Sequence, residues 1–318
     1  MIRIGRPILL IAGLLLPSLV FGAEPLTQVH IEGEPVPVYF NDGDTFRIKG
    51  GKRQGSRSRL AGFNTLESFG PVHQWGKWTK RELYVLAKTA TQFARLGMWR
   101  CHTNFERDTY GRFLFHCPDL RLEQIRRGLA HAMTVTADPA DSELLEAQVE
   151  AIKNKRGMWA HGVPEYVMTS LHSILERPGE YASNRLVSTR DGHSEKWRHN
   201  RAYKECEEVC FQEVEISPET IRASDTALLG APEISEFWTP LSLKEKVHVM
   251  RIWLMIDSIA AFVPSEKREA LADALSKLVE AGTLVPSATR KGSCMVYTDH
   301  TRRFGEGKAK CLKIEGAL

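Results

Sequence analysis

Short apolar runs separated by turn residues mark the early part of the chain. The runs Val29–Glu32, Val36–Tyr39 and Thr45–Ile48 are separated by Gly, Pro, Asn and Asp, so we predict a strand for each. Apolar residues then recur at spacings of three and four from Trp78 to Leu96. This spacing predicts a helix, with Gly97 as its stop.

A long-looped hairpin and two further helices are predicted next. Met98–His102 and Phe113–His116 have strand character and flank a turn-rich segment. Leu122–Gly128 predicts a short helix, and Asp141–Arg156 has the periodicity of an amphipathic one. Strands wrapped round one helix, with more helices at the end, favour a small closed barrel with helical caps.

The pattern changes after about residue 164. Residues 165–200 are mostly polar and show little apolar periodicity, which predicts a linker or an irregular region. Beyond it, Leu243–Phe262 and Ser265–Ala281 predict two helices, while Met295–Tyr297 and Lys310–Ile314 predict strands. We therefore expect a separate, helix-rich C-terminal region at residues 201–318.

The N-terminus has the pattern of a secretory signal. Arg3 and Arg6 precede an apolar run from Pro7 to Phe21, and small residues follow it. This order predicts a signal peptide over residues 1–23. A retained membrane anchor is the alternative, but the apolar run is shorter than the roughly 20 residues that a spanning helix needs. We expect an exported protein, periplasmic or secreted, with no membrane association after cleavage.

Export changes what the cysteines imply. In an oxidising compartment an even number of cysteines favours disulfides, and the spacing of these cysteines does not suit a zinc finger. We predict three disulfides, with Cys101 and Cys117 paired across the predicted hairpin. The remaining four are expected to pair within the C-terminal region, with their connectivity left open: Cys206, Cys210, Cys294 and Cys311.

Composition sets only broad limits. Hydrophobic residues make up 42% and charged residues 26% of the chain, which excludes collagen-like, fully disordered and multi-span membrane proteins. The net charge of +4 is small, but the segment Arg47–Arg59 contains six basic residues and no acidic one. Such a segment suits contact with a polyanion, with Lys49 and Arg57 as candidate contacts, although a solvated basic loop would look the same.

Three short motifs carry candidate chemistry. Asp44 follows an Asp-Gly turn, Arg59 and Glu67 bracket an apolar strand, and the motif Asp108–Arg112 lies in the hairpin loop 104–112. Together they supply an oxygen ligand for a hard cation, a carboxylate that can position water, and two guanidinium groups. Guanidinium groups hold the charge that develops on a phosphate under attack, so the combination predicts phosphodiester hydrolysis.

In these motifs, and in the runs Ile125–Ala130 and Glu146–Trp159, the sequence resembles the thermonuclease (staphylococcal-nuclease-like) family over residues 36–160. The resemblance implies an α+β domain over residues 24–164, built as a five-stranded OB-fold β-barrel with three helices. It also implies a phosphodiesterase or endonuclease that cleaves DNA or RNA with calcium beside the scissile phosphate. The C-terminal region carries no such resemblance, so its function and any protein partner stay open.

The resemblance also implies individual roles. The calcium ligands would be the side chains of Asp44 and Asn64 and the carbonyl of Thr65. Glu67 would be the general base or water-orienting group. Arg59 and Arg112 would bind the phosphate, and Tyr110 would contact it as well. Asn64 stands where the family usually has an aspartate, so we expect weaker calcium binding or a preference for another divalent ion.

Two alternatives accompany this interpretation. Degenerate members of the family serve as nucleic-acid- or protein-binding modules without catalysis. The joint presence of Asp44, Arg59, Glu67 and Arg112 favours an enzyme over such a module. The second alternative concerns the aromatic residues after Glu67. Their rings could stack on bases, or they could pack this loop onto the following helix. These residues are His73, Trp75 and Trp78.

Overall fold

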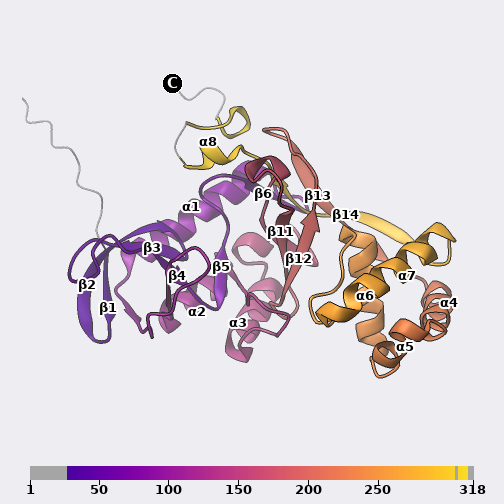
Figure 1. Ribbon diagram of the computed structural model, residues 1–318. Coiled ribbons are helices and arrows are strands. Elements are labelled where there is room, and N and C mark those ends of the chain that lie inside the picture. The colour runs from indigo at the N-terminus through magenta and orange to yellow at the C-terminus, as the bar shows by residue number, and fades with distance from the viewer. Residues whose placement is uncertain (1–26, 305–306, 314–318) are drawn as a thin grey trace, which may run out of the picture.

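The computed structural model describes residues 27–304 and 307–313, so the predicted signal peptide lies outside the described residues. The described part contains eight α-helices and fourteen strands, and the predicted mixed α+β class is confirmed. Figure 1 shows the first strands at one end of the molecule, the helices α4 to α7 at the other, and strands β10 to β14 between them. Within the described residues, no helix is long and apolar enough to cross a membrane.

The first sheet has the order β3-β2-β1-β7. β1 (Thr27–Ile31) runs antiparallel to β2 (Glu34–Asp42), which pairs with β3 (Thr45–Ile48). β1 also pairs in parallel with β7 (Trp99–Cys101). Alternate side chains of these strands point into one apolar core, as expected for strands with one buried face. The buried members include Val29, Val38, Phe40, Phe46 and Ile48.

Two short strand pairs lie against this sheet. β4 (Ser58–Leu60) runs parallel to β8 (Phe113–Phe115), and β5 (Phe63–Thr65) runs antiparallel to β9 (Ala130–Ala132). A single isolated bridge between Arg47 and Arg57 links β3 to the start of β4. The regular ladder between β3 and β4 is interrupted at Phe46, whose backbone N–H and carbonyl bond to the Ser58 hydroxyl instead of to the β4 backbone. The strands form separate sheets, and the closed five-stranded barrel that we predicted is not confirmed in the described residues.

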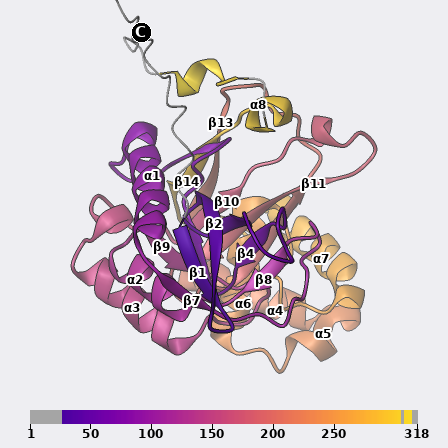
Figure 2. The same ribbon diagram turned by 90° about the vertical axis from the view of Figure 1, so that its left-hand side faces the viewer.

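Three helices cover this first group of strands, as predicted. They are α1 (Lys80–Leu96), α2 (Pro118–Arg126) and α3 (Ser142–Lys153), seen together in Figure 2. A capping box between Thr79 and Glu82 begins α1. α2 begins earlier than predicted because Pro118 occupies its first turn, where a missing N–H costs nothing.

Residues 165–200 differ from the irregular structure that we predicted. They contain β10 (Tyr166–Ser170), β11 (Ala182–Ser188) and β12 (Ser194–His199), paired in that order into an antiparallel sheet. Several of the buried positions on these strands are polar, among them Asn184 and Glu195. Because polar residues occupy buried positions, the apolar alternation that would reveal the strands is missing.

A third sheet joins distant parts of the chain. β13 (Glu208–Glu215) pairs with β14 (Ala288–Val296), and β14 pairs on its other side with β6 (Val72–Gln74). β6 lies between Glu67 and α1, so a strand near the C-terminus completes a sheet next to the predicted site.

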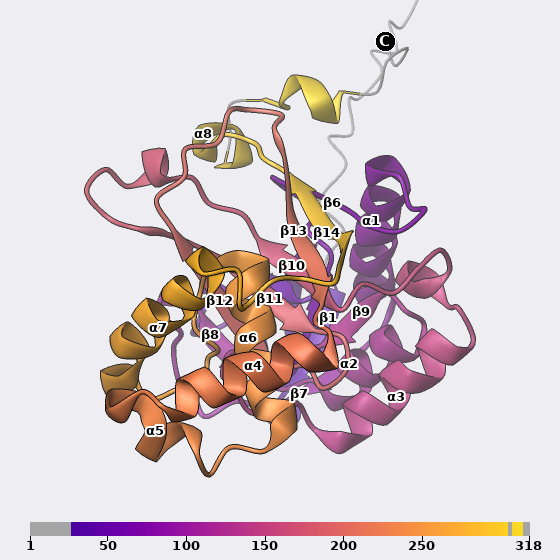
Figure 3. The ribbon, with the colours of Figure 1, turned by 90° about the vertical axis from the view of Figure 1, so that its right-hand side faces the viewer.

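Four helices gather on the side shown in Figure 3: α4 (Pro218–Leu229), α5 (Pro232–Trp238), α6 (Leu243–Ile256) and α7 (Arg268–Glu280). α4 and α5 were not predicted. α6 ends before its predicted limit because Asp257 adopts a left-handed conformation that caps it. A short helix α8 (His300–Phe304) follows β14. The strand predicted at Lys310–Ile314 is wrong, since Lys310–Leu312 forms a 3-10 turn; Ile314 lies outside the described residues.

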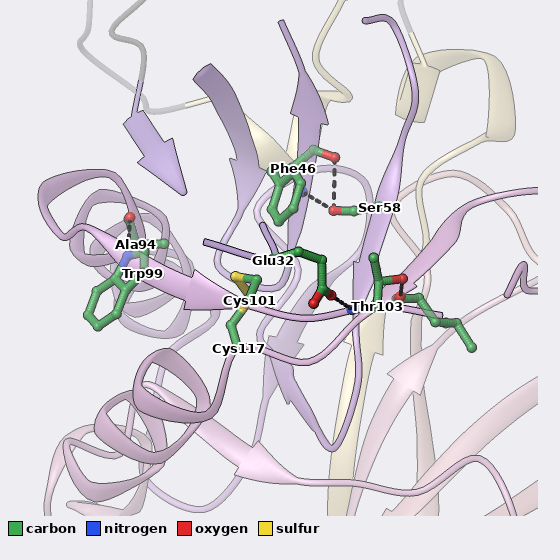
Figure 4. Close-up of a disulfide and its surroundings, with 9 residues drawn as sticks. Glu32, Phe46, Ser58, Ala94, Trp99, Cys101, Thr103 and Cys117 are labelled. Atoms are coloured by element: carbon green, nitrogen blue, oxygen red, sulfur yellow. Dashed lines mark hydrogen bonds between the residues drawn. A yellow bond between two sulfur atoms is a disulfide. The ribbon is translucent and has the colours of Figure 1, made fainter. Parts of the chain in front are cut away.

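All six cysteines form disulfides. Cys101 bonds Cys117 (Figure 4), Cys206 bonds Cys311, and Cys210 bonds Cys294. His102 and His116 exchange two backbone hydrogen bonds of 2.9 Å. The neighbouring pair, Cys101 and Cys117, is therefore close enough to bond, with its Cα atoms 4.2 Å apart.

Candidate active site

A tight turn fixes the position of Asp44 at the start of β3. A Cβ atom at Gly43 would lie 2.5 Å from Cγ2 of Thr65, so only glycine fits there. The carbonyl of Gly43 accepts a hydrogen bond of 2.8 Å from Nε2 of Gln124 on α2. The Asp44 side chain is buried, at 3% exposure, and faces β4 and β5 rather than solvent.

Arg59 brings three of the predicted residues into one group. Its Nη1 donates to Oδ1 of Asp44 at 2.6 Å, and its Nη2 donates to Oδ1 of Asn64 at 2.7 Å. The other Asp44 oxygen accepts a bond of 2.8 Å from the backbone N–H of Thr65. β4, β5 and the turn before β3 therefore converge on Asp44.

The atoms of this group that could bind a cation are all oxygens. They are the Asp44 carboxylate, the Asn64 side-chain oxygen and the Thr65 carbonyl, which accepts a 2.7 Å bond from Nδ2 of Asn64. Oxygen donors that include a carboxylate suit a hard divalent cation such as calcium. In the structure the Arg59 guanidinium supplies the positive charge beside two of these oxygens.

Two further carboxyl groups lie close to Asp44. Burial raises the pKa of Glu67 to about 7, and the nearby Asp44 adds to the rise, while Arg59, Arg112 and Arg303 oppose it. Burial also raises the pKa of Asp42 well above its ordinary value, and Asp44 and Glu67 add to that rise. Three carboxyl groups therefore crowd together here, and nearby arginines offset their charge; a bound divalent cation would likewise favour their ionised forms.

Asp42 was not among the predicted site residues. Its Oδ1 accepts a hydrogen bond of 3.2 Å from the backbone N–H of Asp44. The signal that could have found it is its place in the same Asp-Gly-Asp turn as Asp44. Its carboxyl group is a third acidic side chain beside Asp44 and Glu67.

Arg112 is held by its own loop. Its Nη2 lies 2.7 Å from Oδ2 of Asp108, and Oδ1 of the same carboxylate accepts the backbone N–H groups of Tyr110 and Arg112 at 2.9 Å each. These bonds fix the loop conformation and leave Arg112 partly exposed. Because Arg112 shifts the pKa of Glu67, its charge lies within electrostatic reach of that carboxyl group.

The three predicted substrate contacts lie in different places. Tyr110 is 62% exposed, beside the Arg112 guanidinium, and its carbonyl accepts a 3.2 Å bond from Nη2 of Arg57. The basic segment Arg47–Arg59 therefore contacts the hairpin loop 104–112 beside the site. Lys49 instead lies over the ring of Tyr39 on β2, with Nζ 5.4 Å from the ring centre.

Two arginines beyond residue 164 reach the site and were not predicted. The Arg303 side chain of α8 lies against Gly70, where an added Cβ atom would be 2.7 Å from Cγ of Arg303. Burial lowers the pKa of Arg185 on β11, an effect that Tyr110 opposes and Arg59 reinforces, so Arg185 lies near both. No local motif marks either residue, because pairing of distant strands brings them here.

The aromatic residues after Glu67 pack the loop rather than offer stacking surfaces. His73 and Trp75 are 1% and 2% exposed, and Trp75 lies in an apolar cluster with Leu83 of α1. Nε1 of Trp78 donates to the carbonyl of Met158 at 2.9 Å. The packing interpretation of this loop therefore holds, and base stacking by His73 or Trp75 is excluded by their burial.

Comparison with known families agrees with this geometry. Residues 57–161 match the family described as staphylococcal nuclease homologue. The resemblance inferred from the sequence motifs is thus confirmed for this nuclease-homologue segment, which contains Arg59, Glu67 and Arg112 but begins after Asp44. The rest of the chain matches no family, and no curated protein matches the chain.

Proposed function

We propose that this protein hydrolyses phosphodiester bonds of DNA or RNA in a metal-dependent reaction. The observation that carries the proposal is the single group formed by Asp44, Arg59, Glu67 and Arg112, with Arg59 bonded to Asp44 and the charges of Arg59 and Arg112 acting on Glu67. A module that only binds nucleic acid would have no use for buried carboxyl groups, which repel a polyanion. The nuclease-homologue segment supports the same conclusion.

Glu67 is the proposed proton acceptor. The attacking water would pass a proton to its carboxylate as the new phosphorus–oxygen bond forms, while the bond from phosphorus to the leaving sugar oxygen breaks and that oxygen takes up a proton from solvent. A general base works best when its pKa lies near the working pH, and the pKa of about 7 satisfies this condition at neutral pH. Arg59 and Arg112 would hold the non-bridging phosphate oxygens, whose charge grows during the attack.

The proposed cation ligands are Asp44, the side-chain oxygen of Asn64 and the carbonyl of Thr65. A bound calcium ion would supply a permanent positive charge beside the phosphate. Because Asn64 carries no charge, manganese and magnesium are the ions to compare with calcium. We also propose that the protein is exported, since the N-terminal pattern and three disulfides both suit an oxidising compartment.

A digestion assay tests this function. Plasmid DNA and RNA are incubated with the purified full-length protein in calcium, in excess chelator, and in chelator followed by restored calcium. We expect cleavage only when calcium is present. Binding of nucleic acid without cleavage under every metal condition would overturn the enzyme and support the binding module instead.

A further inference from the structure

A second group of ligand-type side chains lies between β12 and α6. His193 immediately precedes β12, Glu195 lies on it, and His248 lies on α6. Oε1 of Glu195 is 3.3 Å from Nε2 of His193 and 2.9 Å from Nε2 of His248. The three ligand atoms all lie within 4.8 Å of one another, and none of the three residues belongs to the candidate active site.

His193 is oriented as a ligand would be. Its Nδ1 is bonded to the carboxylate of Asp191, which leaves Nε2 facing the group. The side chain is only 7% exposed, and within the described residues Nε2 is buried and makes no hydrogen bond. The polar atom beside it is Oε1 of Glu195 at 3.3 Å, which pairs with His193 when the imidazole is protonated; when the imidazole is neutral, a metal ion between the two atoms is the alternative.

Glu195 is a buried carboxylate on β12. Its side chain is 2% exposed, and Oε2 accepts a bond of 2.7 Å from the backbone N–H of Ala261. Oε1 is then directed at the two imidazoles. A buried carboxylate is stable only when it is paired or when it binds a metal.

We propose that Nε2 of His193, Oε1 of Glu195 and Nε2 of His248 bind a zinc ion. Zinc takes imidazole and carboxylate ligands at about 2.0–2.2 Å in a tetrahedron, whose edges are then about 3.3 Å long. The two short ligand–ligand distances of 3.3 and 2.9 Å come close to that edge. Asp191 supplies the carboxylate that commonly orients a zinc-bound histidine from behind. Water would fill the fourth position.

The proposed ion would link parts of the chain that are distant in sequence. It connects β12 to α6, and through Glu195 to the backbone at Ala261. The turn that holds His193 also contacts the nuclease-homologue segment, because the carbonyls of Asp191 and Gly192 accept bonds of 2.8 Å from Ala140 and Thr134. Zinc at this place would therefore stabilise the contact between this segment and the residues that follow it.

The test uses full-length protein stripped of metal and titrated with Co²⁺, whose visible absorption distinguishes four-coordinate sites with nitrogen ligands from six-coordinate oxygen sites. We expect one equivalent of four-coordinate Co²⁺, displaced by Zn²⁺ and retained in Asp44→Asn. In His248→Ala the affinity should fall by more than about 100-fold, because even an outer-shell partner is worth about 10- to 100-fold. His199→Ala, on the same strand, is the matched control and should retain the signal.

A second variant and a crystal of the wild-type protein also test the zinc site, so the test does not depend on the folding of His248→Ala. Asp191→Asn should weaken zinc binding by about 10- to 100-fold, since it disturbs only the orientation of His193. A crystal of the wild-type protein grown with zinc should show anomalous scattering among the three ligand atoms. Anomalous scattering absent from this group at saturating zinc, or a Co²⁺ signal unchanged by His248→Ala, would overturn the site and leave the group as ion pairs of protonated histidines.

Discussion

Arg59 and Asp44 form an ion pair with 2.6 Å between Nη1 and Oδ1, and the same guanidinium donates to Asn64 at 2.7 Å. The proposed phosphate-binding arginine thus already bonds two of the proposed cation ligands. A bound cation and Arg59 would compete for these oxygens. Cation binding would therefore release Arg59 towards the phosphate, which links the metal to substrate binding.

Replacing Asn64 by aspartate should tighten calcium binding. The change adds a carboxylate at a position that the structure places beside Asp44, and calcium prefers charged oxygen ligands. We expect a gain of roughly tenfold in affinity, which corresponds to about 1.4 kcal/mol. Calorimetric titration with calcium measures it, with Asn41→Asp near the end of β2 as the control. An unchanged or weaker affinity would contradict the assignment of Asn64 as a ligand.

Glu67→Gln should lower turnover without unfolding the protein. The amide keeps the shape of the side chain but cannot accept the proton of water, so kcat should fall by roughly 100- to 10,000-fold. Cleavage kinetics and thermal unfolding are measured together. Glu143→Gln, an exposed change on α3, should leave both unaffected. Near wild-type cleavage by folded Glu67→Gln protein would remove Glu67 from the mechanism.

Arg59→Ala and Arg112→Ala should differ in their effect on stability. Both should reduce kcat by roughly 100- to 1,000-fold, because each removes a charge that stabilises the transition state. Arg59 also bonds buried Asp44 and Asn64, so its loss should cost about 1 to 3 kcal/mol in the free energy of unfolding. Arg112 bonds a partly exposed Asp108, and its loss should cost less than about 1 kcal/mol. Chemical denaturation of both variants measures this difference in the free energy of unfolding. Equal losses in the two variants would contradict the greater structural role assigned to Arg59.

Acid should destabilise the protein through His73. Burial lowers the pKa of this histidine from 6.5 to about 3, and nearby His131 adds to the effect. Between these values the unfolded chain binds a proton that the folded protein does not. The stabilisation is complete above the unfolded pKa and is lost as the pH falls, by about 1.4 kcal/mol for each pH unit.

Urea unfolding of wild-type and His73→Gln protein at several pH values checks this prediction. As the pH falls, the free energy of unfolding of the variant should decrease less steeply than that of the wild type. The difference should be about 1.4 kcal/mol for each pH unit, the contribution of one proton. His30→Gln, a partly exposed histidine of β1, is the control and should follow the wild type. Parallel stability curves for wild type and His73→Gln would show that His73 is not the group responsible.

Local sequence patterns predicted the parts of the site that are set by local structure. Asp44 follows a turn that only glycine at position 43 permits. The single strand predicted between Arg59 and Glu67 is instead two short strands, β4 and β5, which place Arg59 and Asn64 beside Asp44. Disulfide bonding of Cys101 to Cys117 followed from the predicted hairpin in the same way. In each case residues close in sequence determine the geometry, so a pattern of residue types is sufficient.

The features that were missed depend on contacts between distant segments. β11 and β12 bury Asn184 and Glu195, whose polar side chains find partners far along the chain, so no apolar alternation marks these strands. Arg303 reaches the loop at Gly70 only because β14 pairs with β6. The closed barrel is not confirmed for a related reason, since the pattern of strand residues does not reveal that the Ser58 hydroxyl replaces backbone hydrogen bonds between β3 and β4.

The pairing of β14 with β6 also has a consequence for how the protein is made. β6 leaves the ribosome long before β14, its neighbour in the sheet, and until β14 arrives β6 has no strand of that sheet to pair with. Unpaired edges promote aggregation, so we expect the growing chain to depend on chaperones. The loop that carries Glu67 is connected directly to β6 and settles only when β14 is in place. A truncated chain that lacks β14 would therefore leave the proposed nuclease site incomplete, so we expect it to cleave no nucleic acid.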